Sequence, residues 1–416
     1  MNLPDGWKYT KLSEIGSFSK GNGIKREESN SGSIPAVRYG EIYTEHNDYI
    51  KQFHSFISEN VAKDAVLIKN GDLLFSCSGE TKEDIGKCVA FVSDKKAYAG
   101  GDIIVFTPSI TCDSKYLGFL FNSYNINKQR YRYAQGDSIV HISSESLGKL
   151  VFYLPPLAEQ RKIAQILTTQ DRLISLKEKL LEQKQAQKKW LMQTLLEVPH
   201  EGKEHAEKFS IGGVVIDKSG WKKEKINKIA KLSSGSTPQR DDKKNFVGNI
   251  LWLTSGELKK KYISNTLEHI SEQAVKSSNL QIYEPGTVVI AIYGLEAAGI
   301  RGTCSIITSE CAISQACMAF TDFEEVSNEY FYYWYVFNGQ TIGIRYAQGT
   351  KQQNLCTDLI GTLTIPIPTL PEQKIIAKVL SAADKEIDLL KQEIELQKQK
   401  KKALAQLLLS GTVRVK

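Results

Sequence analysis

Residues 157–196 read LAEQRKIAQILTTQDRLISLKEKLLEQKQAQKKWLMQTLL, a stretch without glycine or proline around which the rest of the chain is organised. Nearly every position holds a good helix former. Apolar pairs return every seven residues, as at Leu173/Ile174 and Leu180/Leu181. A seven-residue repeat keeps one stripe of a helix facing a partner helix, because the coil then has 3.5 residues per turn. The stretch therefore predicts one helix of a coiled coil, roughly 60 Å long.

The same helix occurs again near the C-terminus. The segment 154–160 (LPPLAEQ) aligns with the segment 367–373 (IPTLPEQ), and the apolar series continues in step after both. The series is interrupted at equivalent points, Lys188 and Lys401, and a glycine, Gly411, follows the second helix. The expected contact stripe, called the spacer seam below, consists of Leu167, Ile174, Leu181 and Leu195 in the first helix and Leu380, Ile387, Ile394 and Leu408 in the second.

The repeat extends through the segments that precede the helices. Gly6-Trp7-Lys8 matches Gly220-Trp221-Lys222, and Arg132-Tyr133-Ala134-Gln135-Gly136 matches Arg345-Tyr346-Ala347-Gln348-Gly349. The chain is thus domain, helix, linker, domain, helix. The expected ranges are 1–154 for the first domain, 155–198 for the central spacer helix, 199–219 for a linker, 220–369 for the second domain and 370–411 for the C-terminal spacer helix.

Composition limits the class of protein. A chain of 416 residues is too long for one core, and no apolar run has the length of a membrane span, so we expect a cytoplasmic protein. The seven cysteines form no C-x-x-C pair, which indicates reduced, mostly buried thiols. Ordinary core packing explains them better than a metal site does. The net charge of +7 fits a polyanionic partner, but most of the excess lies on the helical segments.

Each domain mixes expected strands, such as 102–106 and 287–290, with expected helices at 115–121 and 329–337. The aromatic run 330–335 is better explained by core packing than by base stacking. If the two seams pair, the long helices must run antiparallel. The expected fold is therefore α+β, with two homologous mixed α/β globular domains separated by two long antiparallel coiled-coil helices and related by a pseudo-two-fold axis, a symmetry that suits two half-sites on duplex DNA.

This order of elements resembles the specificity subunit of a type I restriction-modification enzyme. The resemblance rests on the Trp7 and Trp221 openings, the proline-rich segment with Glu-Gln at the head of each helix, the run Gly235-Ser236-Thr237-Pro238 and Trp252-Leu253. It implies that each globular domain is a target recognition domain for one half of a split, asymmetric DNA site. It also implies helices that set the spacing and dock modification (methyltransferase) subunits, two of them, with restriction and motor subunits joining through the complex.

The sequence offers no catalytic motif of its own. It has no phosphate-binding loop, no methyl-donor fingerprint and no His-Glu-x-x-His. Asp72 with Glu80-x-Lys82 resembles a nuclease set only superficially, because Asp72 aligns with Thr287. The resemblance implies no cofactor on this chain, and S-adenosylmethionine, ATP and Mg²⁺ on partner subunits. The alternatives are a self-contained DNA methyltransferase or nuclease, and a structural coiled-coil adaptor.

Candidate DNA contacts are polar or basic residues in loops, where the two halves differ or share an arginine. Arg132 and Arg345 are each either a phosphate clamp or a structural arginine. The first-half candidates are Lys20, Asn22, Lys25, Arg26, Ser78, Thr81, Lys82, Arg132, Gln135 and Ser138. The second-half candidates are Thr237, Gln239, Arg240, Tyr293, Arg345, Gln348, Thr350, Lys351 and Gln352.

Overall fold

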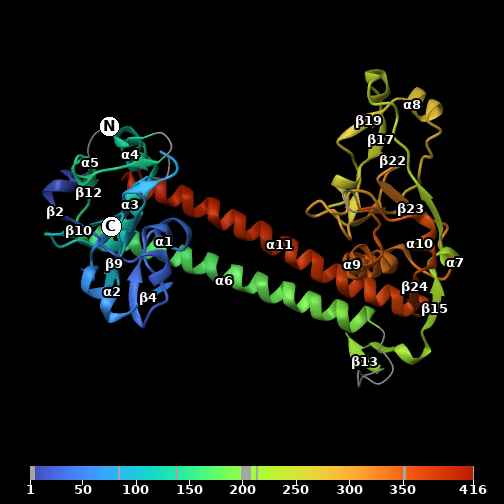
Figure 1. Cartoon of the computed structure of the whole chain (residues 1–416), viewed down its shortest axis with the longest axis horizontal. Coiled ribbons are helices and arrows are strands. Elements are labelled where there is room, and N and C mark those ends of the chain that lie inside the picture. Colours follow the sequence, from blue (N-terminus) through green and yellow to red (C-terminus); the bar gives the residue numbers. More distant parts are fainter. Residues whose placement is uncertain are drawn as a thin grey trace. The chain divides into compact units, whose positions relative to one another are not determined.

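Two long helices, α6 (Leu157–Leu196) and α11 (Leu370–Leu409), dominate the computed structural model (Figure 1). The structure describes residues 5–82, 85–136, 139–197, 208–211, 214–349 and 353–415. The chain forms two compact units, Met1–Lys179 with Gln392–Lys416 and Leu180–Lys391. Each unit therefore contains one globular domain and about half of each long helix. The expected fold class, α+β with duplicated globular domains and two long helices, is confirmed.

The first globular domain contains two four-stranded sheets, ordered β2-β10-β6-β8 and β4-β3-β9-β5. A separate antiparallel pair, β1 and β12, joins the start of the chain to the segment just before α6. The strands are β1 (Lys8–Lys11), β2 (Gly16–Lys20), β3 (Ile34–Val37), β4 (Ser55–Ile57), β5 (Val66–Ile68), β6 (Leu73–Ser76), β7 (Ser78–Gly79), β8 (Cys88–Ala90), β9 (Ala97–Ala99), β10 (Ile103–Pro108), β11 (Val140–His141) and β12 (Val151–Leu154). The helices are α1 (Tyr39–Thr44), α2 (Glu59–Asp64), α3 (Ser114–Phe121), α4 (Tyr124–Tyr133) and α5 (Ser144–Gly148).

The second domain has a similar arrangement with the strands divided differently between its two sheets. Its five-stranded sheet has the order β16-β23-β20-β21-β18, its three-stranded sheet the order β19-β17-β22, and β15 pairs with β24 as β1 pairs with β12. The strands are β15 (Lys222–Lys225), β16 (Lys231–Ser234), β17 (Ile250–Leu253), β18 (Tyr262–Ile263), β19 (Glu268–Ile270), β20 (Val288–Ala291), β21 (Cys304–Ile307), β22 (Cys311–Ile313), β23 (Cys317–Thr321) and β24 (Thr364–Ile367). The helices are α7 (Ile226–Ile229), α8 (Glu272–Ser277), α9 (Asn328–Tyr346) and α10 (Thr357–Thr362).

Each unit has its own apolar core, to which one end of each long helix contributes. Leu167 of α6 and Leu408 of α11 belong to the core of the first unit. Leu195 and Leu380 belong to the core of the second, together with the whole aromatic run 330–335. The expectation that this run packs in a core is therefore confirmed, and it offers no exposed stacking platform.

One helix differs between the domains. The second domain has a single 19-residue helix, α9, where the first has α3 and α4 separated at Asn122. The Asn122 side chain accepts a hydrogen bond from the Cys88 amide (3.0 Å) and donates to the Cys88 carbonyl (2.7 Å) and to Asp48 (3.1 Å). These bonds satisfy the edge of β8, and asparagine is favoured where the backbone leaves the helix.

The long helices pair in antiparallel fashion within each unit. In the first unit Lys177 pairs with Glu393 (2.6 Å) and Glu178 with Lys398 (2.7 Å). In the second unit Lys184 pairs with Glu386 (2.8 Å). The first unit also has the pair Asp171–Lys401 (2.7 Å), and the second has the pair Lys188–Asp384. Asp171 precedes Lys177 whereas Lys401 follows Glu393, and Lys184 precedes Lys188 whereas Glu386 follows Asp384, so the helices are antiparallel in each unit. Seven spacer-seam residues are buried and one, Leu181, is half-buried.

The expected linker contains regular structure. Within 199–219 the structure describes residues 208–211 and 214–219, where β13 (Lys208–Ile211) pairs with β14 (Val214–Asp217). This hairpin was not expected, because the polar composition of the range suggested a solvated segment. Among the described residues, no helix combines the length and apolar character required to cross a membrane.

Candidate nucleic-acid interface

The duplicated Arg-Tyr-Ala-Gln-Gly motif forms the same structure in both domains. In each case a helix ends at the tyrosine and the alanine takes an extended conformation. Gln135 and His141 exchange two backbone hydrogen bonds (3.0 and 2.7 Å), and Gln348 and Asn354 do the same (both 2.9 Å). The segments bounded by these bonds, 135–141 and 348–354, are called the first and second hairpin loops below.

A glycine is required at the same point of both hairpin loops. Gly136 has φ +103° and Gly349 has φ +104°, which is left-handed backbone that side chains rarely adopt. A Cβ on Gly136 would also overlap the carbonyl oxygen of Ile139. The shared motif is therefore scaffold, and the chain between its fixed ends is free to differ.

In the first domain the hairpin loop pairs with the segment that contains the candidates Ser78, Thr81 and Lys82. β11 runs antiparallel to β7, with His141 opposite Ser78, and the two side chains share a hydrogen bond of 3.1 Å. Tyr43 donates its hydroxyl to the Ser78 carbonyl (2.9 Å). Ser78 is buried, so it supports the loop from within, while His141 is exposed.

The second domain brings the corresponding segments together. Leu295 donates its amide to the Gln353 carbonyl (3.1 Å), and Gln353 donates to the Glu296 carboxylate (2.8 Å). Leu355 donates to Ile292 (2.8 Å), which places the second hairpin loop beside Tyr293. In each half, the candidates of the hairpin loop and those of the segment at Ser78 or Tyr293 are distant in sequence but thus belong to one loop cluster.

The remaining candidates flank a glycine, Gly21 in the first domain and Gly235 in the second, that lies close to the backbone of another segment. A Cβ on Gly21 would overlap the Gly100 carbonyl, and one on Gly235 would overlap the Ile313 carbonyl. In the first domain Asn22 also donates to the Asp64 carbonyl (2.8 Å). These close contacts anchor both loops and confirm that the two glycines are equivalent.

The Lys20 loop lies near the first hairpin loop. Cys77 precedes Ser78, and its amide donates to the Asp102 carbonyl (2.9 Å). Burial, with the Asp102 carboxylate, raises the pKa of the Cys77 thiol, and the Lys20 ammonium acts in the opposite direction. Lys20 lies opposite Ile104 of β10, and Ser76, next to Cys77, lies opposite Ile103 on the other edge of the same strand.

The candidate residues differ in exposure. The exposed ones are Lys20, Asn22, Lys25, Arg26, Thr81, Arg132, Gln135, Gln239, Arg240, Tyr293, Arg345 and Gln348. Lys82 and Thr237 are half-buried and Ser78 is buried. Ser138, Thr350, Lys351 and Gln352 lie outside the described residues. Within the described part of the chain, no hydrogen bond or ion pair holds the exposed side chains of Arg132 and Arg345.

The structural arginines are others, which the sequence did not single out. Arg130 is buried in the first domain and donates to the Gly86 carbonyl and to Asn127. Its counterpart in the repeat is Gly343, and the space beside that glycine is filled from the opposite side by Arg301, which donates to Gln353. The aligned repeat could have revealed these arginines. In the first domain Arg130 packs against Gly86, and in the second Arg301 packs against Gly343, so the arginine and the glycine are interchanged.

The Trp and Glu-Gln motifs join each domain to its long helix. Trp7 donates its indole to Glu159 (3.0 Å), and Trp221 donates to Glu372 (3.4 Å). Gln160 accepts from the amide of Asp113 (2.9 Å), the residue that caps α3. Gln373 does the same for Ser327 (2.7 Å), which caps α9. These motifs therefore attach each domain to the start of its long helix.

The residues weighed for catalysis or metal binding have structural roles. Asp72 is buried and accepts hydrogen bonds from the Lys69 amide (2.8 Å) and the Thr107 hydroxyl (2.7 Å), which is a turn-stabilising arrangement. Burial raises the pKa of Cys311 and of Cys317 to about 12. Among the described residues, no three His, Cys, Asp or Glu side chains gather as metal ligands would.

Two similar domains, each with a cluster of dissimilar loops, are joined by paired helices. A sequence model of the type I restriction modification DNA specificity domain matches residues 4–184 and again residues 218–398. The chain belongs to the type I DNA specificity family. It carries two specificity (target recognition) domains, and their duplication is thus confirmed independently of the structure.

Relatives and solved structures of this family span the whole chain. A putative type I restriction enzyme specificity subunit, MjaX, of Methanocaldococcus jannaschii is 26% identical over all of this chain and 95% of its own length. The MjaVIII subunit of the same organism is 22% identical with the same coverage. The S subunit from M. genitalium has a TM-score of 0.58 at 14% identity and covers 98% of each chain. The HsdS subunit of Thermoanaerobacter tengcongensis has a TM-score of 0.52 at 17% identity and covers 99% of each.

Proposed function

We propose that each specificity domain recognises one half of a split, asymmetric duplex DNA site through its hairpin loop and the loops beside it. The observation that carries this is the repetition of the loop scaffold with different residues on it. Bases are distinguished by side chains that reach their edges, whereas a shared arginine suits the phosphate backbone common to all sequences. Arg132 and Arg345 fill the second role, and Gln135, Thr81, Gln348 and Tyr293 are candidates for the first.

The proposal extends to the partners. Helices α6 and α11 set the unread gap between the half-sites and dock two modification subunits, and restriction and motor subunits join through that complex. This chain catalyses no step. S-adenosylmethionine serves the modification subunits, and ATP with Mg²⁺ serves the motor and restriction subunits. The family membership of the chain and its M. jannaschii relatives support this division of labour.

Methylation mapping tests the proposal. The chain is expressed with its modification subunit in cells lacking other adenine methyltransferases, and methylated positions are read on single DNA molecules. We expect one bipartite motif with a fixed gap, and none when either protein is omitted. Methylation by this chain alone, or a continuous motif, would contradict the proposal.

A further inference from the structure

Arg26 and Arg240 occupy equivalent positions, five residues after the anchoring glycines Gly21 and Gly235. The strands beside them are also in register. Ala36 lies opposite Ser55 in the first domain, as Trp252 lies opposite Glu268 in the second. Ala36 therefore corresponds to Trp252, and Ser55 to Glu268. Any difference between the two arginines has to come from these neighbours.

In the second domain Arg240 contacts one carboxylate and two aromatic rings, whose centres lie 5.7 Å apart. Its two terminal nitrogens donate to the two oxygens of Glu268 at 2.6 and 3.0 Å. The guanidinium also lies 4.6 Å from the ring centre of Phe246 and 4.8 Å from that of Trp252. Paired hydrogen bonds use the fork that a guanine or a phosphate would need.

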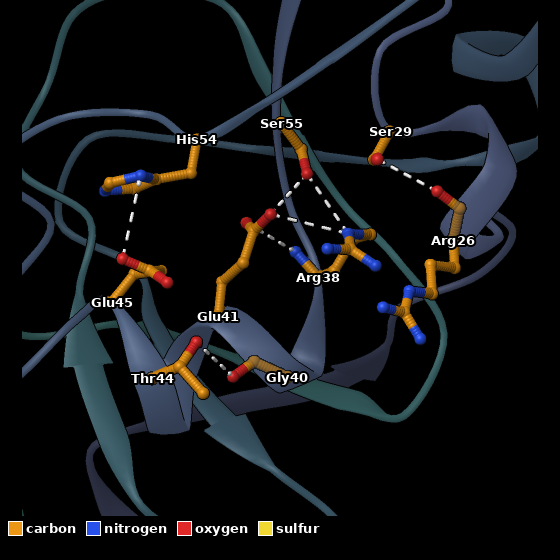
Figure 2. Close-up of polar contacts among 9 residues, drawn as sticks. All are labelled: Arg26, Ser29, Arg38, Gly40, Glu41, Thr44, Glu45, His54 and Ser55. Carbon is orange, nitrogen blue, oxygen red and sulfur yellow. Dashed lines mark hydrogen bonds and ion pairs between the residues drawn. The ribbon is translucent and has the colours of Figure 1, made fainter. Parts of the chain in front are cut away.

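In the first domain Ala36 and Ser55 stand where Trp252 and Glu268 contact Arg240, so this ring and this carboxylate are absent. A different arginine, Arg38, occupies this face of the sheet (Figure 2). Its Nε donates to the Ser55 hydroxyl (3.1 Å) and lies 3.4 Å from the Glu41 carboxylate. Glu41 is buried, and a buried carboxylate needs a cation and donors beside it. Arg38 meets that need, so no partner is left for Arg26.

Arg26 is consequently presented on a fixed backbone with an unengaged side chain. Its carbonyl accepts the Ser29 hydroxyl (2.9 Å), and the adjacent Lys25 amide donates to Glu28 (2.7 Å). Figure 2 shows its guanidinium apart from the Arg38–Glu41–Ser55 network. Within the described residues, no hydrogen bond or ion pair reaches this guanidinium, and the side chain is exposed.

We propose that Arg26 is a DNA contact of the first domain, while Arg240 stabilises its own domain and makes no DNA contact. This inference rests on the proposed function. A guanidinium that is already exposed and unpaired can turn its fork to DNA without breaking a bond. Arg240 would first have to give up Glu268 and two aromatic rings.

The test is a comparison of Arg26→Ala with the matched variant Arg240→Ala, each made in the full chain purified with its modification subunit. A randomised duplex DNA library is selected with each complex, and affinity for the wild-type motif is measured at several salt concentrations. For Arg26→Ala we expect roughly tenfold or weaker binding and an unchanged Tm. For Arg240→Ala we expect a Tm lower by a few degrees and affinity within about twofold of wild type.

The remaining readouts identify the atom contacted on DNA. Loss of information at one base of the first half-site marks a base contact, and Arg26→Lys then fails to restore it. Uniformly weaker binding with a salt slope smaller by about one marks a phosphate contact, which Arg26→Lys restores. Wild-type affinity and motif in Arg26→Ala would overturn the inference, as would equal loss in both variants without a change in Tm. A wild-type complex that selects no motif would instead contradict the proposed function.

Discussion

Glu159 and Glu372 hold the same tryptophan contact at the start of the two long helices, but their other partners differ. Arg414 donates two hydrogen bonds to Glu159 (2.7 and 2.8 Å), which ties the C-terminal segment to the first unit. Glu372 instead accepts from the backbone of Asp217 (3.1 Å) and of Thr369 (2.9 Å). One carboxylate therefore carries an ion pair and the other carries neutral hydrogen bonds.

The Arg414 contact makes the stability of the first unit depend on pH. Burial alone would raise the pKa of Glu159, but the hydrogen bonds from Arg414 and Trp7 and the Arg414 charge outweigh it and lower the pKa below 4.5. A carboxyl with a lowered pKa in the folded state contributes stability above its unfolded pKa and loses it as pH falls through the folded value. Glu159→Gln should therefore cost about 1–3 kcal/mol at pH 7 and progressively less below about pH 4.5.

Urea unfolding at pH 7, 5 and 4 measures this difference. Glu372→Gln is the matched control. Since burial opposes the hydrogen bonds that lower the pKa of Glu372 as well, its cost should fall in acid too, but from a smaller value because no ion pair is lost. A cost of Glu159→Gln that is the same at all three pH values would show that the Arg414 pair contributes nothing.

The repeat in the sequence predicted which loop segments share a scaffold better than it predicted the surroundings of individual side chains. Arg132 and Gln135 follow from the repeat, because a shared motif before dissimilar residues indicates a scaffold with variable contacts. The burial of Ser78 did not follow, because a serine beside a glycine is typical of an exposed loop. Nor did the roles of Arg26 and Arg38, which depend on cross-strand neighbours that no local pattern reveals.

At the scale of elements, the long helices were predictable and their polar contact was not. The seven-residue series placed the seam, and its interruption at Lys188 and Lys401 was visible. The acidic partners were missed, although Asp171 and Asp384 are also equivalent in the repeat. Lys401 pairs with Asp171 (2.7 Å) and Asp48 (3.1 Å), and Lys188 pairs with Asp384. The interruption of each apolar stripe is thus the site of an ion pair between the two helices. Such a pair can be predicted only when the register between the helices is known.

These two ion pairs should differ in what their loss costs. Removing one partner of a half-buried pair leaves the other charge with only partial compensation from solvent. Asp384→Ala leaves Lys188 without a carboxylate and the Tyr333 hydroxyl without its acceptor (2.9 Å), so we expect a loss of about 2–3 kcal/mol. Asp171→Ala should cost less, about 1–2 kcal/mol, because Lys401 keeps Asp48.

Urea denaturation of both variants gives the comparison. The double variant Lys188→Met/Asp384→Leu replaces the pair with apolar side chains of similar size and should recover most of the stability lost in Asp384→Ala. If the double variant were no more stable than the single one, the loss would come from the Tyr333 hydrogen bond or the shape of the site rather than from an unpaired charge.

At the scale of the whole molecule, the duplication predicts that the two specificities are separable. Replacing residues 1–154 with the first domain of another family member should change one half of the methylated motif and leave the other half intact. The donor needs a tryptophan at position 7 and a residue at position 113 whose amide reaches Gln160, since these contacts join the domain to α6. Methylation mapping that showed both halves altered would disprove independent recognition.

The paired helices make a further prediction about the gap between the half-sites. The ion pairs cross between α6 and α11 in both units, so lengthening one helix alone would shift its charges and seam out of register with the other. Four residues, one helical turn, should therefore be inserted in both, after Lys179 and after Lys391. Each helix then gains ~6 Å, and at ~3.4 Å per base-pair step the unread gap should grow by one or two base pairs while both half-sites stay the same.

Insertion into α6 alone is the control and should lower stability without defining a new gap. A motif whose gap is unchanged by the double insertion would mean that the helices do not set the spacing, and the proposal would then have to assign it to the modification subunits.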